Sequence, residues 1–164
     1  MTTMTADEAF ALAERYHEAG DGEKAMAHYH QAAALGRVAA MHSIAHCYLY
    51  GIFVKQDYDE CFRWFTKAVE GGCPQGMYHL GLCHTMGYGT PVDLVKGAEW
   101  YRLSAERGDE DAMYELAKIY EEGKGVARDM EQARHWYEKA AALGQGDAAA
   151  RMDACEADGS CPLR

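Results

Sequence analysis

The sequence lacks long apolar runs, an excess of basic residues and the short motifs of common catalytic sites. No apolar run approaches the roughly 20 residues that a membrane-spanning helix needs, so no membrane span is predicted. The first residues have no basic stretch followed by an apolar core, which predicts a cytoplasmic protein without an export signal. A nucleophile elbow, a phosphate-binding loop, a dinucleotide fingerprint and an HExxH motif are all missing, and we therefore predict no catalytic residues.

Basic residues are outnumbered, with 16 against 26 acidic residues and a formal net charge of −10. Nucleic acids and anionic membranes bind proteins through a basic surface, so the charge argues against both as partners. An acidic protein favours a basic partner. The alternative is that the charge serves only solubility.

The six cysteines are an even number, as disulfide-bonded proteins often have. However, Cys47, Cys83 and Cys155 share one position in a 36-residue period, and Ile119 completes that series. A position that accepts Cys or Ile is a small apolar packing site, which predicts buried, reduced thiols. Cys155 and Cys161 are the one pair that we suspect of bridging.

The 36-residue period runs through most of the chain. Trp64, Trp100 and Trp136 recur at this spacing, and we expect their side chains to be buried between successive helix pairs. Such self-similarity indicates stacked supersecondary units, none of which can bury its apolar face alone. Glycines recur in step with the tryptophans, at Gly36, Gly72, Gly108 and Gly144.

The last complete unit reads as two helices. Apolar residues at helical spacing run from 112 to 120, and the pattern breaks at the glycine-rich loop 123–125. Asp129 then precedes a second helix as its N-terminal cap, and Gly144 ends that helix. Because a capping carboxylate satisfies free backbone N–H groups, we interpret the periodic series Asp57, Asp93 and Asp129 as structural.

The segment from Ala117 to Gly144 resembles the Sel-one-like repeat family, a relative of the tetratricopeptide repeats with a 36-residue unit. It carries that family's G-x-G-V loop, the following Asp and Ala, a Trp-Tyr pair, a Lys-Ala-Ala run and the final Gly. Two earlier units match as well, although one has Phe53 where the second loop glycine is expected and the other has Thr-Pro at 90–91. The first unit has four fewer residues between its helices and is closer to the tetratricopeptide pattern.

The resemblance implies an all-α fold, a right-handed α/α superhelical solenoid of about four two-helix repeats plus a C-terminal capping helix. We expect residues 1–164 to form a single repeat domain. Its parts are a divergent tetratricopeptide-like repeat over 6–36, Sel-one-like repeats over 38–72, 74–108 and 110–144, a capping helix over 146–157 and a tail over 158–164.

By resemblance to tetratricopeptide proteins, the first helix of each unit lines a concave groove. The inward positions lie three residues before, one after and five after a small residue such as Ala117. They are aromatic and amphipathic in the middle of the chain and acidic toward its ends, at Glu14, Glu18 and Glu122. Adaptable and aromatic side chains of this kind suit a peptide or a partner helix. The candidate partner-binding residues are Phe10, His42, His46, Tyr50, Tyr78, Leu82, Met86, Tyr114 and Lys118.

Two pairs of side chains have a spacing that could suit a metal ion. His42 and His46 are four residues apart, as are His79 and Cys83. Zinc takes three or four converging ligands, and neither pair has an obvious third ligand nearby in the sequence. The sequence therefore predicts no metal site and no cofactor.

The resemblance implies a non-catalytic, monomeric module for protein–protein interaction. As an adaptor, scaffold or regulator, it would hold a peptide or partner domain, with a basic one favoured, in its concave groove. The alternative is an immunity or inhibitor protein that neutralises one specific toxin or enzyme, a role that bacterial relatives include. An enzyme of the cysteine-rich β-lactamase-like type is disfavoured, because the regular cysteine pairs of those relatives are missing here.

Overall fold

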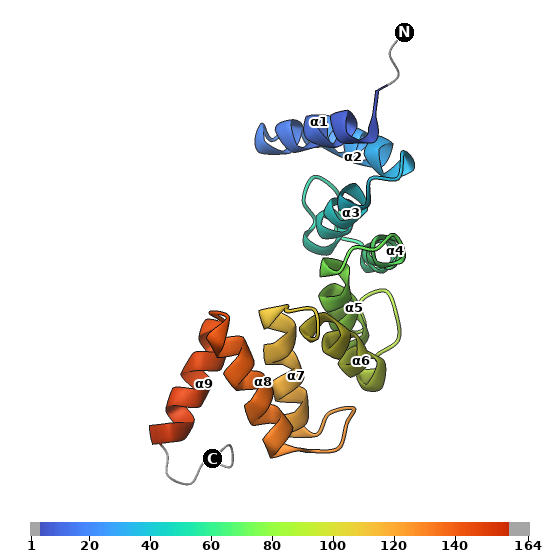
Figure 1. The fold of residues 1–164 in the computed structure, drawn as a ribbon. Coiled ribbons are helices and arrows are strands. Elements are labelled where there is room, and N and C mark those ends of the chain that lie inside the picture. The colour runs from blue at the N-terminus through green and yellow to red at the C-terminus, as the bar shows by residue number, and fades with distance from the viewer. Residues whose placement is uncertain (1–3, 158–164) are drawn as a thin grey trace. The chain divides into compact units, whose positions relative to one another are not determined.

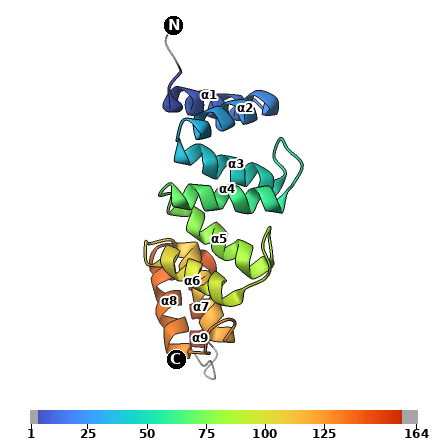
Figure 2. The same ribbon diagram turned by 90° about the vertical axis from the view of Figure 1, so that its right-hand side faces the viewer.

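The computed structural model describes residues 4–157, and within them the chain forms nine α-helices and no strand. Consecutive helices pack as hairpins, seen for α1 with α2, α3 with α4, and α7 with α8 (Figures 1 and 2). The predicted all-α solenoid of helical hairpins is confirmed. None of these helices is long and apolar enough to cross a membrane. The helices are α1 (Ala6–Glu18), α2 (Gly22–Ala34), α3 (Val38–Tyr50), α4 (Tyr58–Glu70), α5 (Gln75–Met86), α6 (Leu94–Ala105), α7 (Glu110–Glu122), α8 (Met130–Ala142) and α9 (Gly146–Ala157).

The helices fall into two compact units, and the division passes through α5. Unit 1 takes the chain up to Gly76 together with Tyr88–Pro91, so it holds α1 to α4. Unit 2 takes Met77–Gly87 and the chain from Val92 onward, so it holds most of α5 and the helices after it. The α9 helix occupies the place expected for a cap, and the predicted tail over 158–164 lies outside the described residues.

The aspartate series caps the second helix of each repeat, as predicted. The side chain of Asp57 accepts hydrogen bonds from the backbone N–H groups of Asp59 and Glu60, each at 3.0 Å. The corresponding bonds to Asp93 and Asp129 are also 3.0 Å long. These carboxylates satisfy N–H groups that the first helical turn leaves free, so local chemistry accounts for their recurrence.

The centre of each hairpin is an aromatic residue of its second helix. Tyr29, Phe65, Tyr101 and Tyr137 recur every 36 residues and are at most 2% exposed. Small residues facing them allow the close packing, since a Cβ added to Gly81 would lie 2.7 Å from the Tyr101 ring. The three tryptophans, which we expected to be buried, are only half-buried. The residue after each tryptophan is the one that fills the core.

A loop position explains why Phe53 departs from the repeat pattern. Phe53, Gly89 and Gly125 are equivalent, and all three have a positive φ of 63° to 78°. A Cβ on Gly89 would lie 2.2 Å from the carbonyl oxygen of Tyr58, which begins the second helix of the preceding repeat. Phe53 faces Gly22 instead, and a Cβ added to Gly22 would meet the Phe53 side chain at 2.4 Å. In one contact the loop residue is Gly89 and the helix begins with Tyr58. In the other the loop residue is Phe53 and the helix begins with Gly22, so the bulky residue and the glycine have exchanged places.

The cysteines of the repeat position are buried thiols, as predicted. Cys47 and Cys83 are each 1% exposed and Ile119 is 8% exposed, and both cysteines are free. Burial raises the pKa of the Cys47 thiol to about 11, which keeps it protonated and unreactive at neutral pH. The suspected bridge between Cys155 and Cys161 lies outside the side chains that the structure describes.

Candidate functional site

The candidate surface is the set of nine first-helix side chains that the sequence predicts to bind a partner. Phe10 lies on α1 and Tyr50 near the end of α3, whereas α5 and α7 carry the members of unit 2. Tyr50 and Met86 are the most exposed of its apolar members, at 60% and 56%. The other seven are half-buried: Phe10, His42, His46, Tyr78, Leu82, Tyr114 and Lys118.

Four of these side chains pack on the buried aromatic residue of their own repeat. The distances between ring centroids are 6.0 Å for Phe10 and Tyr29, 5.6 Å for His42 and Phe65, 5.6 Å for Tyr78 and Tyr101, and 5.7 Å for Tyr114 and Tyr137. Each pair is tilted or edge-on, the geometry that aromatic quadrupoles favour. These four rings of the candidate surface therefore rest on the core, which restricts their movement.

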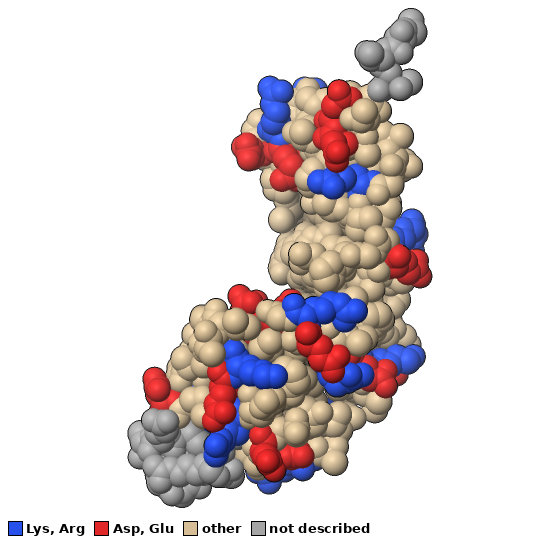
Figure 3. Space-filling view, in the orientation of Figure 1, with Lys and Arg blue, Asp and Glu red and all other residues tan. Residues whose placement is uncertain are grey.

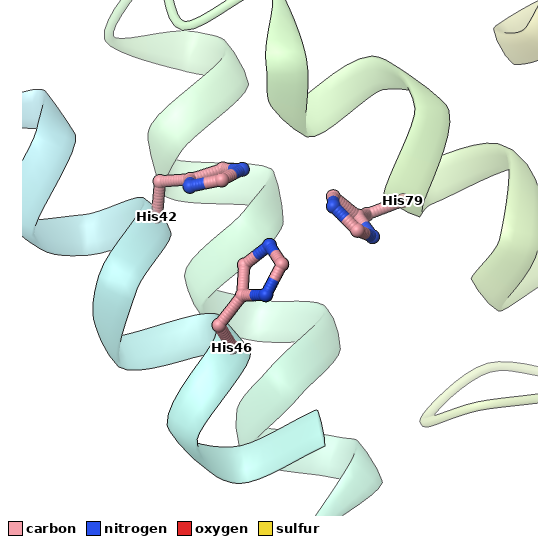
Figure 4. A group of neighbouring side chains, drawn as sticks. All are labelled: His42, His46 and His79. Carbon is pink, nitrogen blue, oxygen red and sulfur yellow. The ribbon is translucent and has the colours of Figure 1, made fainter. Parts of the chain in front are cut away.

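Three ring residues follow one another along α3. His42 and His46 extend from successive turns toward the same side (Figure 4), with ring centroids 4.6 Å apart. Tyr50 lies one turn further on, 5.7 Å from His46. Burial lowers the pKa of His42 to about 4, and the charge of His46 acts in the same direction. Burial also lowers the pKa of His46, so both rings are neutral at pH 7. The third histidine labelled in Figure 4, His79, belongs to α5 in unit 2.

In unit 2 the candidate surface includes an open pocket of about 370 Å³. Met86 and Lys118, both predicted site residues, contribute to its lining. Lys118 forms an ion pair with Glu115 at 2.9 Å, and its Nζ atom lies 5.2 Å from the centre of the Tyr114 ring. The pocket thus combines apolar walls with a fixed charge pair. The remaining lining residues, which were not among the predicted site residues, are Thr85, Leu94, Tyr101, Glu115, Ile119, Glu122 and Lys124.

The helices that carry the middle of the candidate surface are uncharged. Neither α3 nor α5 contains a Lys, Arg, Asp or Glu. Figure 3 shows the result for unit 1, where the surface over α3 is free of red and blue on the face in view. Of the acidic positions expected near the ends, Glu18 and Glu122 are exposed, whereas Glu14 accepts a hydrogen bond from the buried hydroxyl of Tyr29.

The hydroxyls of two buried tyrosines each have a polar partner on the first helix of their own repeat. In both repeats the partner lies four residues after the small residue that defines the register of that helix. The Tyr137 hydroxyl donates to Glu121 at 2.8 Å, and the Tyr101 hydroxyl lies 3.4 Å from the hydroxyl of Thr85. In the second repeat the buried ring is Phe65, which has no hydroxyl, and Leu49 occupies that register position. Aromatic residue and partner therefore change together from repeat to repeat. The sequence carries this correlation, although the site prediction did not use it.

The pairing predicts that Phe65→Tyr destabilises the protein by about 1 to 3 kcal/mol, because it buries a hydroxyl beside Leu49. Adding Leu49→Thr, the arrangement of Thr85 and Tyr101, should recover at least half of that loss. Urea unfolding of the two single variants and the double variant would give the coupling free energy. Strictly additive effects would contradict the pairing.

Comparison with known proteins identifies the repeats. The sequence profile of the Sel1 repeat matches residues 9–36, 38–73, 74–109 and 110–145. The chain belongs to the Sel1 repeat family. Sel1 repeats generally mediate protein–protein interaction and act as non-catalytic scaffolds. The first repeat, which we expected to be divergent, is matched along with the other three.

Solved structures of Sel1 repeat proteins resemble this chain over most of its length. A Sel1 repeat protein from Oxalobacter formigenes has a TM-score of 0.87 and 27% identity over 98% of this chain and 67% of its own. The protein c5321, a protective antigen of uropathogenic Escherichia coli strains, has a TM-score of 0.84 and 34% identity over 87% of this chain. This chain spans 32% of c5321. Cysteine rich protein B of Helicobacter pylori has a TM-score of 0.61 and 29% identity, over 79% of this chain and 93% of its own. No curated protein sequence matches this chain.

Proposed function

We propose that this Sel1 repeat protein is a non-catalytic interaction module that holds a peptide or a partner domain against the first helices of its repeats. The observation that carries the proposal is found in each unit separately. On α3 in unit 1 and on α5 in unit 2, uncharged rings pack on the core of their own unit, and each helix carries an exposed side chain near its end, Tyr50 or Met86. Preorganised aromatic and Met side chains bind with little loss of conformational entropy.

The expected partner is a protein or peptide that offers apolar side chains to this surface. The open pocket beside Met86 and Lys118 has the volume for one or two such side chains, and the ion pair of Lys118 with Glu115 would orient a polar neighbour. The net charge of −10 favours a partner that is basic around its apolar contact residues. We expect the module to act as a monomer.

Tyr50→Ser combined with Met86→Ser should abolish partner binding and leave the fold intact, since both side chains are more than half exposed. Truncating His42, Tyr78 or Tyr114 would be a poorer test, because these rings pack on the core. The measurement is quantitative mass spectrometry of proteins retained from native lysate by the immobilised chain. We expect the bound partner to fall at least tenfold.

A matched control removes two apolar side chains of similar exposed fraction from another part of the molecule. Val92 and Val95 are 60% and 55% exposed, in the loop before α6 and on α6 itself. Val92→Ser with Val95→Ser should retain the partner. Equal retention by both double variants would show that the first helices do not bind it. A single stoichiometric partner of high affinity would instead favour an inhibitor of one target over a scaffold.

A further inference from the structure

The two histidines of α3 form a chelating arrangement within unit 1. They stand in the sequence His42-Ser-Ile-Ala-His46, and residues four apart lie on one face of a helix. Zinc proteases of the HExxH type use the same spacing to supply two imidazole ligands from one helix. Ser43 occupies the place of the catalytic glutamate, so the spacing here supports metal binding and not hydrolysis.

The rings are close to the geometry that one ion requires. A ligand nitrogen of His42 and one of His46 lie within 4.8 Å of each other. Two nitrogens on a tetrahedral zinc ion, each at about 2.05 Å, stand about 3.3 Å apart, a separation that a small rotation of either ring would reach. Both rings contact Phe65 edge-on, with centroid distances of 5.6 and 5.5 Å. This buried side chain supports the pair from beneath and limits where the rings can turn.

The helix that carries the two histidines has no charged side chain that could form an ion pair with them in place of a bound cation. α3 contains no Lys, Arg, Asp or Glu, so its own side chains provide no competing carboxylate or ammonium group. The other pair with this spacing, His79 and Cys83 on α5, differs because Cys83 is 1% exposed and its sulfur is packed in the core. His42 and His46 are half-buried as residues, and the Nε2 atom of His42 is itself buried.

We propose that His42 and His46 bind a divalent transition-metal ion through one imidazole nitrogen each. Imidazole suits zinc, copper and nickel, and we take zinc as the probe. With two ligands from α3, the ion keeps coordination positions for water or for a donor atom of a bound partner. The sequence predicted no metal site because neither candidate pair has a third ligand nearby in the sequence. In the site proposed here, water or a donor atom of the partner would supply the remaining ligands.

The test is a titration of the full chain, stripped with EDTA, with Zn²⁺ at neutral pH. Binding is followed by calorimetry and by the imidazole ¹⁵N resonances of the histidines. We expect the His42 and His46 ring signals to shift together at one equivalent of zinc. His42→Gln and His46→Gln, which keep side-chain volume, should each weaken binding at least tenfold, with the fold checked by circular dichroism.

Two further variants distinguish this site from other zinc ligands. His135→Gln removes an exposed histidine of α8, and Cys73→Ser removes a free thiol that is partly exposed. Both should bind zinc as the wild type does. If zinc affinity is unchanged in His42→Gln and His46→Gln, or is lost in Cys73→Ser, the proposal is wrong.

Discussion

Gly89→Ala should lower the free energy of unfolding by at least about 3 kcal/mol, although it adds a single methyl group. The methyl carbon would lie 2.2 Å from the carbonyl oxygen of Tyr58 and 2.8 Å from the Cβ of Phe62. Backbone and Cβ atoms cannot rotate away, so the loop between α5 and α6 must separate from the start of α4. Urea unfolding followed by circular dichroism would measure the loss.

A second glycine provides the matched control. Gly20 has a φ of 75°, close to the 67° of Gly89, but an added Cβ there would meet nothing within 4 Å. Gly20→Ala therefore reports the cost of the left-handed backbone alone, about 1 to 2 kcal/mol. If both variants lose the same free energy, the close contact at Gly89 has no effect, and the explanation given for the Phe53 and Gly22 exchange fails with it.

The protein should also lose stability as the pH falls through the range in which His42 titrates. The pKa of His42 is about 4 in the folded protein, whereas an unfolded histidine has its ordinary value of 6.5. The unfolded chain therefore binds more protons between these values, and the free energy of unfolding decreases as the pH falls from 6.5 toward 4. At about 1.4 kcal/mol for each pKa unit, His42 alone accounts for a loss on the order of 3 kcal/mol.

His42→Tyr isolates this contribution from the carboxylates that also titrate in acid. Tyrosine occupies the equivalent position at 78 and 114, so the hairpin accepts it. In buffer with EDTA, the variant should show a shallower decrease in stability between pH 6.5 and pH 4.5 than the wild type. His135→Gln, the exposed control, should follow the wild-type profile. Parallel profiles for His42→Tyr and wild type would show that burial of His42 does not contribute to acid sensitivity.

Features set by local sequence were the ones that the sequence predicted well. The helix boundaries follow from apolar periodicity, the capping aspartates and the left-handed glycines, each of which acts within a few residues. Burial of Cys47 and Cys83 was predictable because Ile119 occupies the same position, which reveals an apolar environment without any structure.

Features set by contacts between helices were predicted less well. The tryptophans looked like core residues, but the following aromatic, such as Tyr137, fills the core, since one residue turns a side chain by about 100° around a helix. Likewise, Phe53 looked like a departure until Gly22 was found opposite it, 31 residues earlier. The candidate surface was placed on the first helices by resemblance, and only packing distances showed that four of its rings rest on the core.

The central claim is that the first helices of the repeats bind a protein partner. The most direct test is hydrogen–deuterium exchange of the wild-type chain with and without the partner recovered from lysate. We predict slower exchange on partner binding in α3, α5 and α7, with the greatest protection around Tyr50 and Met86. Protection confined to α4, α6 and α8 would contradict the claim and would place the binding surface on the second helices.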